Sequence, residues 1–294
     1  MVLDVAEFLQ AVVFGLVEGS VIALGAVGLT LSYGVTRFIN FAYGEFLAYG
    51  AYFALFLSGA WFGMSLPLPV AAVVAVVLVG GLGVVVSRVF FRPISDRGGL
   101  PLLITSIGVA FILRYLLTAS VSAEARQLPV PLMRPVELFG VGITPLELAV
   151  VSVSAVSMLG VHLILTRTML GKTMRATSGN RSLAEVAGID TQGVIRRTWF
   201  ISAAAGGLAG ILYAVLFAPF RPTFGFGYLI VVFAATLLGG IGRPYGAMLG
   251  AVLIGLIISL GSTYLSASYD QAYAFLVLVG VLLFRPEGIR GGEF

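Results

Sequence analysis

Long apolar segments are the feature that most limits what this chain can fold into. Apolar runs occupy residues 8–35, 38–60, 68–91, 100–121, 145–166, 198–219, 226–240, 244–265 and 269–284. A helix needs roughly 20 apolar residues to cross the hydrocarbon core of a bilayer. The run 226–240 is short, and the run 38–60 begins with polar residues, so each is either a full span or a broken helix. The pattern predicts an all-α polytopic bundle with eight to ten crossings.

The composition excludes a water-soluble globule. Only 10% of the 294 residues are charged and 59% are hydrophobic, and the mean hydropathy is +1.07. A soluble domain usually carries about 25% charged residues, so the polar surface here is too small to coat one. We find no internal repeat in the sequence. We therefore expect a single transmembrane domain over residues 1–294, in the cell (inner) membrane.

Several kinds of chemistry are excluded by what the sequence lacks. There is no cysteine, so disulfides and thiol nucleophiles are absent. His162 is the one histidine, which rules out a multi-histidine metal site. No G-x-x-x-x-G-K-[ST] phosphate loop is present, so the chain has no ATP-binding motif of this type. We expect no catalytic residue, metal or cofactor, and therefore not an enzyme.

The basic residues predict the orientation. Cytoplasmic loops of membrane proteins are enriched in Lys and Arg. Three groups fall on one side if all nine runs cross: Arg88, Arg92 and Arg97; Arg167, Lys172, Arg175, Arg181, Arg196 and Arg197; and Arg285 and Arg290. This placement accounts for the net charge of +4 without nucleic acid as a partner. We expect the N-terminus outside and the C-terminus in the cytoplasm.

The basic loop 167–197 contains its own helix signal. Ser182 and Glu185 form the S-x-x-E pattern of a capping box, and Gly188 stands where a left-handed C-cap residue is common. A short amphipathic helix over 182–188 is predicted, with Leu183 on its apolar face. Such a helix either rests on lipid or docks a soluble partner. Its small apolar residues, among them Ala184, favour docking.

Glycine spacing predicts close helix contacts. Gly15 and Gly19 are four residues apart, as are Gly206 and Gly210, and a third series runs through Gly242, Gly246 and Gly250. Faces of small residues allow helix backbones to approach in a membrane. Packing inside the bundle is the simplest interpretation, and a subunit interface remains the alternative.

Glu18, Glu45 and Arg114 are charged residues that lie inside the apolar runs. Such residues usually face a bundle interior, a partner or water. Counting along the runs places Glu18 and Arg114 at similar depth, so we expect them to form a buried ion pair, unless Arg114 extends outward to the interface. Glu45 is expected near Arg37. The polar stretch Asn40, Tyr43 and Glu45 is a candidate for the solute path.

Several motifs in order resemble the permeases of branched-chain amino acid ABC transporters, in particular the first of the two permease subunits. The matching segments are Y-G-V at 33–35, I-N-F-A-Y-G-E at 39–45, G-A-Y at 50–52, A-G-I-L at 209–212 and G-G-I-G at 239–242, together with Thr168, Gly171, Arg175, Ala176, Ala184, Gly188 and Ile189 in the basic loop. In such permeases this loop docks the ATPase, so the resemblance implies that role here for Gly171, Arg175, Ser182, Leu183, Ala184, Glu185 and Gly188.

The resemblance implies a subunit rather than a whole transporter. Its partners would be a second permease chain, two cytoplasmic ATPase subunits, an extracytoplasmic solute-binding protein, a small-molecule substrate and membrane lipid. Two departures concern the solute: Tyr43 stands where a histidine is expected, and Arg243 with Pro244 replaces a small residue after the late glycine motif. These changes could mark relatives that carry urea or short amides.

Two other classes of transport protein compete with this interpretation. An ion-coupled secondary transporter would need titratable residues near the midplane and often has broken helices; only Glu18 and Glu45 are available. A passive channel would need rings of charge or carbonyl-rich loops, for which only the stretch 40–45 would serve. Neither class gives a role to the predicted helix of the basic loop.

Overall fold

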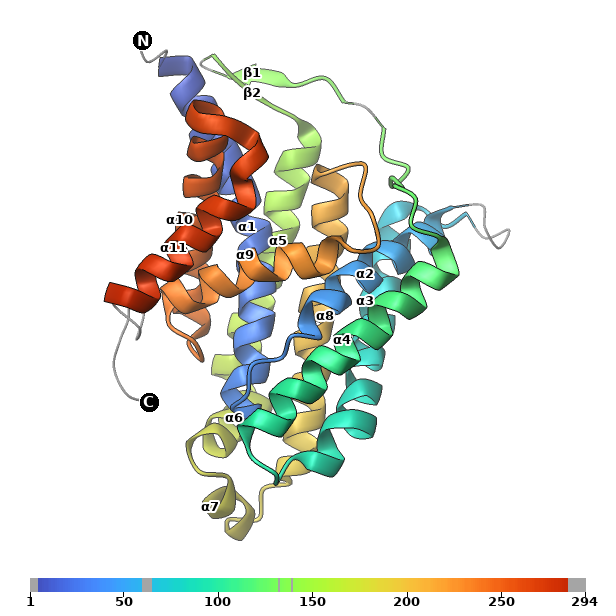
Figure 1. Cartoon of the computed structure of the whole chain (residues 1–294), viewed down its shortest axis with the longest axis vertical. Coiled ribbons are helices and arrows are strands. Elements are labelled where there is room, and N and C mark those ends of the chain that lie inside the picture. The colour runs from blue at the N-terminus through green and yellow to red at the C-terminus, as the bar shows by residue number, and fades with distance from the viewer. Residues whose placement is uncertain (1–4, 60–64, 132, 139, 285–294) are drawn as a thin grey trace.

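The computed structural model describes residues 5–59, 65–131, 133–138 and 140–284, and these form a bundle of helices (Figure 1). Arg285 and Arg290, which were used to predict the orientation, lie outside the described residues. The helices are α1 (Val5–Thr36), α2 (Tyr43–Ser58), α3 (Leu68–Val86), α4 (Gly99–Val121), α5 (Pro145–Arg167), α6 (Met169–Gly179), α7 (Arg181–Val186), α8 (Thr191–Leu216), α9 (Phe224–Gly239), α10 (Pro244–Gly261) and α11 (Asp270–Phe284).

Irregular segments join some of these helices. A π-helical turn (Ser87–Phe91) and a 3-10 turn (Arg92–Ile94) extend α3, and a similar pair (Ser262–Ser266 and Ala267–Tyr269) connects α10 to α11 in an arch. The loop before α5 carries a hairpin of β1 (Val136–Leu138) and β2 (Val141–Ile143), paired antiparallel with Glu137 opposite Gly142. The sequence pattern did not predict this hairpin.

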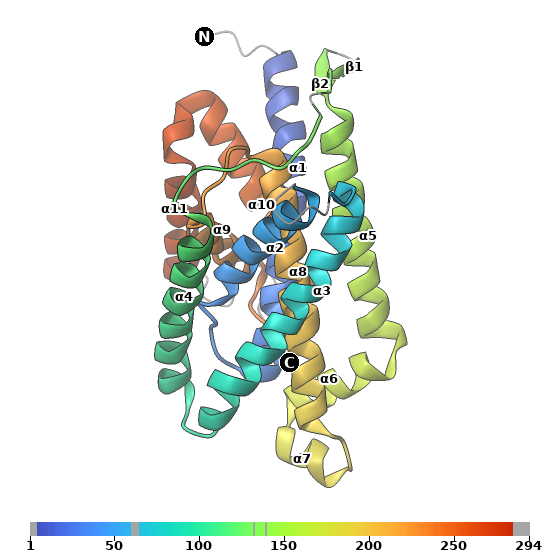
Figure 2. The same cartoon turned by 90° about the vertical axis from the view of Figure 1, so that its right-hand side faces the viewer.

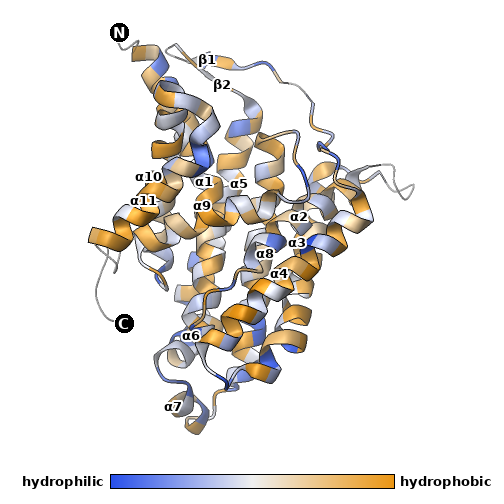
Figure 3. Ribbon diagram, viewed as in Figure 1, coloured by the Kyte–Doolittle hydropathy of each residue, from blue (hydrophilic) through white to orange (hydrophobic). Residues whose placement is uncertain are grey.

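The prediction of a polytopic helical membrane protein is confirmed. Within the described residues, six helical segments are long and apolar enough to cross a membrane. Hydrophobic residues predominate along the long helices, and hydrophilic residues are more frequent around α6 and α7 (Figure 3). Both doubtful runs are short helices: α2 and α9 have 16 residues each, about 24 Å at 1.5 Å per residue, which is less than the hydrocarbon core.

The helices form two repeats of opposite orientation, α1–α4 and α8–α11, although no repeat is visible in the sequence. Each begins with a long helix, continues with a 16-residue helix, and then has two further helices. Helix α1 runs toward α7 and α8 runs away from it (Figure 1). The contacts correspond as well: α1 packs on α10 and α9, while α8 packs on α3 and α2. Inverted repeats of this kind are common in transporters.

Glycine brings the helices close together, as the spacing predicted. Gly15 and Gly19 of α1 face the backbone of α10, where a Cβ on Gly15 would lie 3.0 Å from the Gly255 carbonyl oxygen. Gly210 of α8 lies against the backbone of Leu47 in α2. These faces are therefore used inside the bundle.

One glycine series was assigned incorrectly. Gly242 precedes α10 and has a φ of +85°, so it belongs to the turn between α9 and α10 rather than to a helix face. Only Gly246 and Gly250 continue the series, and they pack on Gly239 and Ala235 of α9. The reason is Pro244, which fixes the first turn of α10 and so separates the turn from the helix.

The two short helices meet end to end near mid-height of the bundle. Gly44 is in the first turn of α2 and Gly225 is in the first turn of α9. A Cβ on Gly44 would lie 2.6 Å from the Gly225 carbonyl oxygen, and a Cβ on Gly225 would lie 2.2 Å from the Gly44 carbonyl oxygen. Helices α4 and α11, which occupy equivalent places in the repeats, flank this junction to its right and left in Figure 1 and lie on the same side of it in Figure 2.

We predict that Gly210→Ala lowers the thermal midpoint of the purified protein. A methyl group there would overlap the Leu47 carbonyl, and overpacking of this kind costs about 1–3 kcal/mol or more. Differential scanning fluorimetry in detergent measures the effect. The matched control is Gly108→Ala in α4, because no described atom lies within 4 Å of that position. Equal midpoints for the two variants would contradict the close contact.

Candidate functional site

The segment that joins α1 to α2 is non-helical and is held by side-chain hydrogen bonds from within the segment and from α4. Arg37 has a φ of +58°, which ends α1. The Asn40 side-chain oxygen accepts a hydrogen bond from the Ala42 amide at 3.0 Å, and the Ser106 hydroxyl of α4 accepts one from the Phe41 amide at 3.1 Å. This segment therefore returns from the α7 end of the bundle to mid-height, where α2 begins.

Tyr43 holds three helices together. Its side chain is fully buried, and its hydroxyl donates to the Gly25 carbonyl of α1 at 2.8 Å. The hydroxyl also lies against Gly28 of α1, and the ring lies against Gly206 of α8. In this conformation Tyr43 packs in the core between α1, α2 and α8.

Glu45 and Arg114 form a buried ion pair. The Arg114 guanidinium donates to Glu45 Oε1 from Nη2 at 2.5 Å and from Nε at 3.1 Å. The Glu45 side chain is 0% exposed and that of Arg114 is 14% exposed. The guanidinium also lies over the ring of Phe226 in α9, 4.6 Å from its centroid. The pair thus links α2, α4 and α9 beside the junction of the short helices.

The expected pair of Glu18 with Arg114 is wrong, and so is the expected pairing of Glu45 with Arg37. Arg37 donates instead to the Ser178 carbonyl. Both errors have one cause: depth was counted as if the run 38–60 were a full span. Because α2 begins only at mid-height, Glu45 lies beside the middle of α4.

Glu18 lies in a separate cavity nearer the N-terminal end of α1. Its side chain is 7% exposed and makes no ion pair or hydrogen bond with the described part of the chain. The cavity has a volume of about 440 Å³ and is also lined by Glu7 and Asp270. No pattern in the sequence connected Glu18 to Asp270, because the contact arises from the arch that brings α11 back along α10.

Unpartnered polar atoms remain beside the junction. Glu45 Oε2 and Asn40 Nδ2 are buried without a hydrogen-bond partner. Asn40 also lines an apolar cavity of about 260 Å³ between the α1–α2 segment, α9 and α11. Its other lining residues are Leu29, Ile39, Phe41, Phe226, Leu229, Ile230, Phe233, Phe275 and Leu278. A buried polar atom without a partner is costly, so this place is suited to a solute with an apolar body and a polar group.

The basic loop forms two short helices, α6 and α7, where one was predicted. The N-cap of α7 is Asn180, whose side chain accepts from the Leu183 amide at 3.0 Å. The predicted Ser182 capping box is therefore wrong: Asn180 is a strong cap residue and starts the helix first. Glu185 instead accepts from Arg181 at 3.1 Å and from Thr191 at 2.5 Å. The predicted left-handed C-cap at Gly188 is confirmed by its φ of +81°.

Helix α7 presents two apolar side chains to the outside. Leu183 is 66% exposed and Val186 is 86% exposed. Ala184, which was expected to take part in docking, is 4% exposed and packs inward. Hydrogen bonds from Thr191 and Arg181 lower the pKa of Glu185 below its usual value, so its carboxylate is charged at neutral pH.

Gly171 and Arg175 attach α6 to the end of α5. Gly171 lies against the Leu165 backbone, and its amide donates to the Thr168 hydroxyl at 3.3 Å. Arg175 donates to the Leu165 carbonyl at 2.5 Å. The predicted loop also ends earlier than residue 197, because Asp190 caps α8 by accepting from the Gly193 amide. Arg196 and Arg197 are therefore within α8.

Comparison with known proteins identifies relatives across almost the whole chain. The family described as branched-chain amino acid transport system, permease component, matches residues 11–284. The high-affinity branched-chain amino acid transport system permease protein BraD of Pseudomonas aeruginosa is 33% identical, over 98% of this chain and 97% of that protein. LivH of Escherichia coli K12, a permease protein of the same kind of system, is 33% identical over 97% and 96%.

One solved structure shares the fold. A chain in the complex of PsaBC from Streptococcus pneumoniae with a Fab aligns with a TM-score of 0.52 and 14% identity. The alignment covers 95% of this chain and 92% of that one. At this identity the likeness concerns the arrangement of helices alone.

We predict that Arg114→Met and Glu45→Gln each destabilise the protein on the order of 3–5 kcal/mol, because each leaves the other partner buried and unpaired. The double variant should lose much less than the sum of the two. Chemical unfolding in detergent provides the double-mutant cycle. Glu18→Gln is the matched control and should be additive with Arg114→Met. Additive effects of Glu45→Gln and Arg114→Met would contradict the pair.

Proposed function

Because this chain belongs to the family of branched-chain amino acid transport permease components, we propose that it is a translocation subunit of an ATP-driven importer for branched-chain or similar apolar amino acids. It is a multi-pass protein of the inner membrane and a transport permease rather than an enzyme. The family match over residues 11–284 is the observation that carries the proposal.

The solute path in this proposal runs beside the junction of α2 and α9. N-termini of interrupted helices carry partial positive charge and attract anionic groups of solutes. The apolar cavity next to Asn40 suits an aliphatic side chain, and Asn40 Nδ2 is a free donor for a carboxylate. Asn40 therefore remains our candidate for solute contact. Glu45 positions Arg114 and the start of α2, and Tyr43 supports the same segment from the core.

In this proposal, other polypeptides bind and hydrolyse the ATP that drives transport. The sequence has no phosphate loop, and α7 presents Leu183 and Val186 outside the bundle. We assign α6 and α7 to the docking of two ATPase subunits on the cytoplasmic side, which puts the N-terminus of α1 outside. A second permease chain would complete the path on the side of α4 and α11, and an extracytoplasmic binding protein would deliver the solute.

A secondary transporter is the competing function, and one observation favours it: inverted repeats with short helices meeting at mid-height also occur in ion-coupled transporters. Urea or a short amide is the competing solute, because Tyr43 departs from the expected histidine. Since Tyr43 is buried and bonded to Gly25, this departure affects core packing and carries little information on the solute.

The proposal is tested by copurification and transport. The tagged chain should copurify with a second permease and with ATPases. Proteoliposomes that contain this complex, supplied with the binding protein, should take up leucine only when ATP is present on the side of the membrane where the ATPases are bound. Uptake by the chain alone, driven by a proton or sodium gradient, would refute the importer. ATP-dependent uptake of urea without leucine would refute the solute.

We predict that the double change Leu183→Asp and Val186→Asp weakens ATPase binding at least ten-fold. Burying an aliphatic side chain contributes about 1.5–3 kcal/mol, and 1.4 kcal/mol is ten-fold. Binding of the ATPases to the detergent-solubilised chain measures this. Stability should not change, because both side chains are exposed.

The matched control for this prediction is Val136→Asp in β1, which is 54% exposed at the opposite end of the bundle. It should leave ATPase binding unchanged. Ala184→Asp is unsuitable as a docking test, since it places a charge in a buried position. Unaltered ATPase binding by the double variant would exclude α7 from the docking surface.

A further inference from the structure

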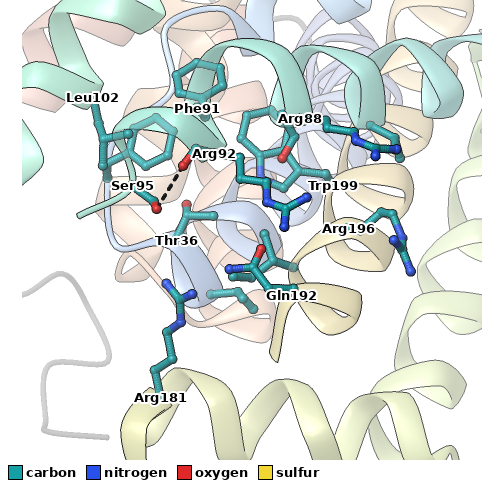
Figure 4. Close-up of a pocket in the computed structure, with 15 residues that line it drawn as sticks. Thr36, Arg88, Phe91, Arg92, Ser95, Leu102, Arg181, Gln192, Arg196 and Trp199 are labelled. Atoms are coloured by element: carbon teal, nitrogen blue, oxygen red, sulfur yellow. Dashed lines mark hydrogen bonds between the residues drawn. The ribbon is translucent and has the colours of Figure 1, made fainter. Parts of the chain in front are cut away.

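Four arginines surround a small pocket at the α7 end of the bundle. They are Arg88 and Arg92, which follow α3, Arg181 of α7 and Arg196 of α8. Figure 4 shows these side chains around the pocket, with Arg181 reaching toward it from α7 and Gln192 beside it. No aspartate or glutamate lines the pocket. Three separate parts of the chain therefore bring positive charge to one place.

These arginines differ from two others near the same end. Arg37 and Arg175 donate to backbone carbonyls, and their charges serve to hold loops. Arg88, Arg92 and Arg196 have no ion pair or side-chain hydrogen bond with any residue that the structure describes. Arg181 shares its charge with Glu185. An unpaired cluster of guanidinium groups repels itself, and an anion bound among them removes that cost.

The pocket has an apolar wall as well as its charged rim. Phe38, Phe91 and Trp199 are buried and stack beside it, with ring centroids 5.1 Å apart between Phe91 and each of the other two. Val85 and Val89, which lie within one helical turn of Arg88, are each 56% exposed on the outer face of the bundle. The arginines therefore stand where exposed apolar residues give way to polar ones, which is the change of environment expected near lipid headgroups.

The size of the pocket limits its ligand. The volume is about 150 Å³, and an engineered cavity of about 150 Å³ in another protein holds one benzene molecule. A phosphate group fits such a space, whereas a whole lipid or a peptide segment does not. Arginine is the residue best suited to bidentate contacts with phosphate oxygens.

We propose that this pocket binds a phosphate-type oxyanion, supplied by the headgroup of an anionic membrane lipid such as phosphatidylglycerol. The bound phosphate lies between Arg92 and Arg181 and so joins the end of α3 to α7. Basic pockets between membrane helices on the cytoplasmic side commonly hold such headgroups. The acyl chains remain in the bilayer, against the exposed aliphatic residues of α3.

The full-length chain in detergent is titrated with short-chain phosphatidylglycerol, with phosphatidylcholine of the same chain length, and with inorganic phosphate at matched ionic strength. The thermal midpoint and mass spectra of the intact protein report binding. Phosphatidylglycerol should raise the midpoint and remain bound. Each arginine near a membrane surface contributes about 1 kcal/mol, so Arg92→Gln should weaken the affinity about five-fold, and Arg88→Gln with Arg92→Gln about 25-fold.

Arg197→Gln is the matched control, because Arg197 is next to Arg196 in α8 and exposed but does not line the pocket. It should change the affinity less than two-fold. An equal loss for Arg197→Gln and Arg92→Gln would mean a diffuse surface attraction and would overturn the site. Equal protection by inorganic phosphate would overturn the lipid as the source. Arginine variants that keep lipid affinity but lose ATPase binding would show a protein-docking surface, which also overturns the proposal.

Discussion

Close approach of helix backbones at glycine is the interaction on which the rest of this structure depends. In lipid there is no hydrophobic difference between a helix surface and its surroundings, so helices associate through packing at small residues. Gly44 and Gly225 allow the first turns of α2 and α9 to touch. Without that contact the short helices would have no place at mid-height, and Glu45 would not lie beside Arg114.

The apolar runs could be predicted because lipid imposes one solution on them. A segment in the bilayer must satisfy its backbone internally, so each long apolar run becomes a helix, and all nine runs coincide with helices. The repeat could not be predicted in this way. It resides in the order, direction and contacts of α1–α4 and α8–α11, whereas almost any apolar side chains can fill the positions involved.

The sequence predicted which charged residues lie inside the membrane, but not which residues they contact. Arg114 was expected to be paired inside the membrane, and it is, but its partner depends on the depth at which α2 starts. That depth is set by Arg37 in a left-handed conformation and by the side-chain bonds of Asn40 and Ser106, which hydropathy cannot show. The capping signal failed for a similar reason: Asn180 precedes Ser182 and captures the helix start. The same S/T-x-x-E signal at Thr144 and Glu147 does form a capping box on α5.

The arrangement gives the proposed docking at α7 a direct mechanical route to the centre of the bundle. Helix α8 begins at Thr191, shortly after α7, and continues without interruption to Leu216. Along its length Gly207 and Gly210 lie against the backbone of α2, and Trp199 packs in the wall of the arginine pocket. Movement applied to α7 is therefore carried by one rigid helix to the half-helix that holds Glu45. Backbone-to-backbone contacts cannot absorb such a shift by side-chain rearrangement, so α2 must move with α8. In the proposed importer, this contact is the route by which ATP bound to another subunit would act on the solute path.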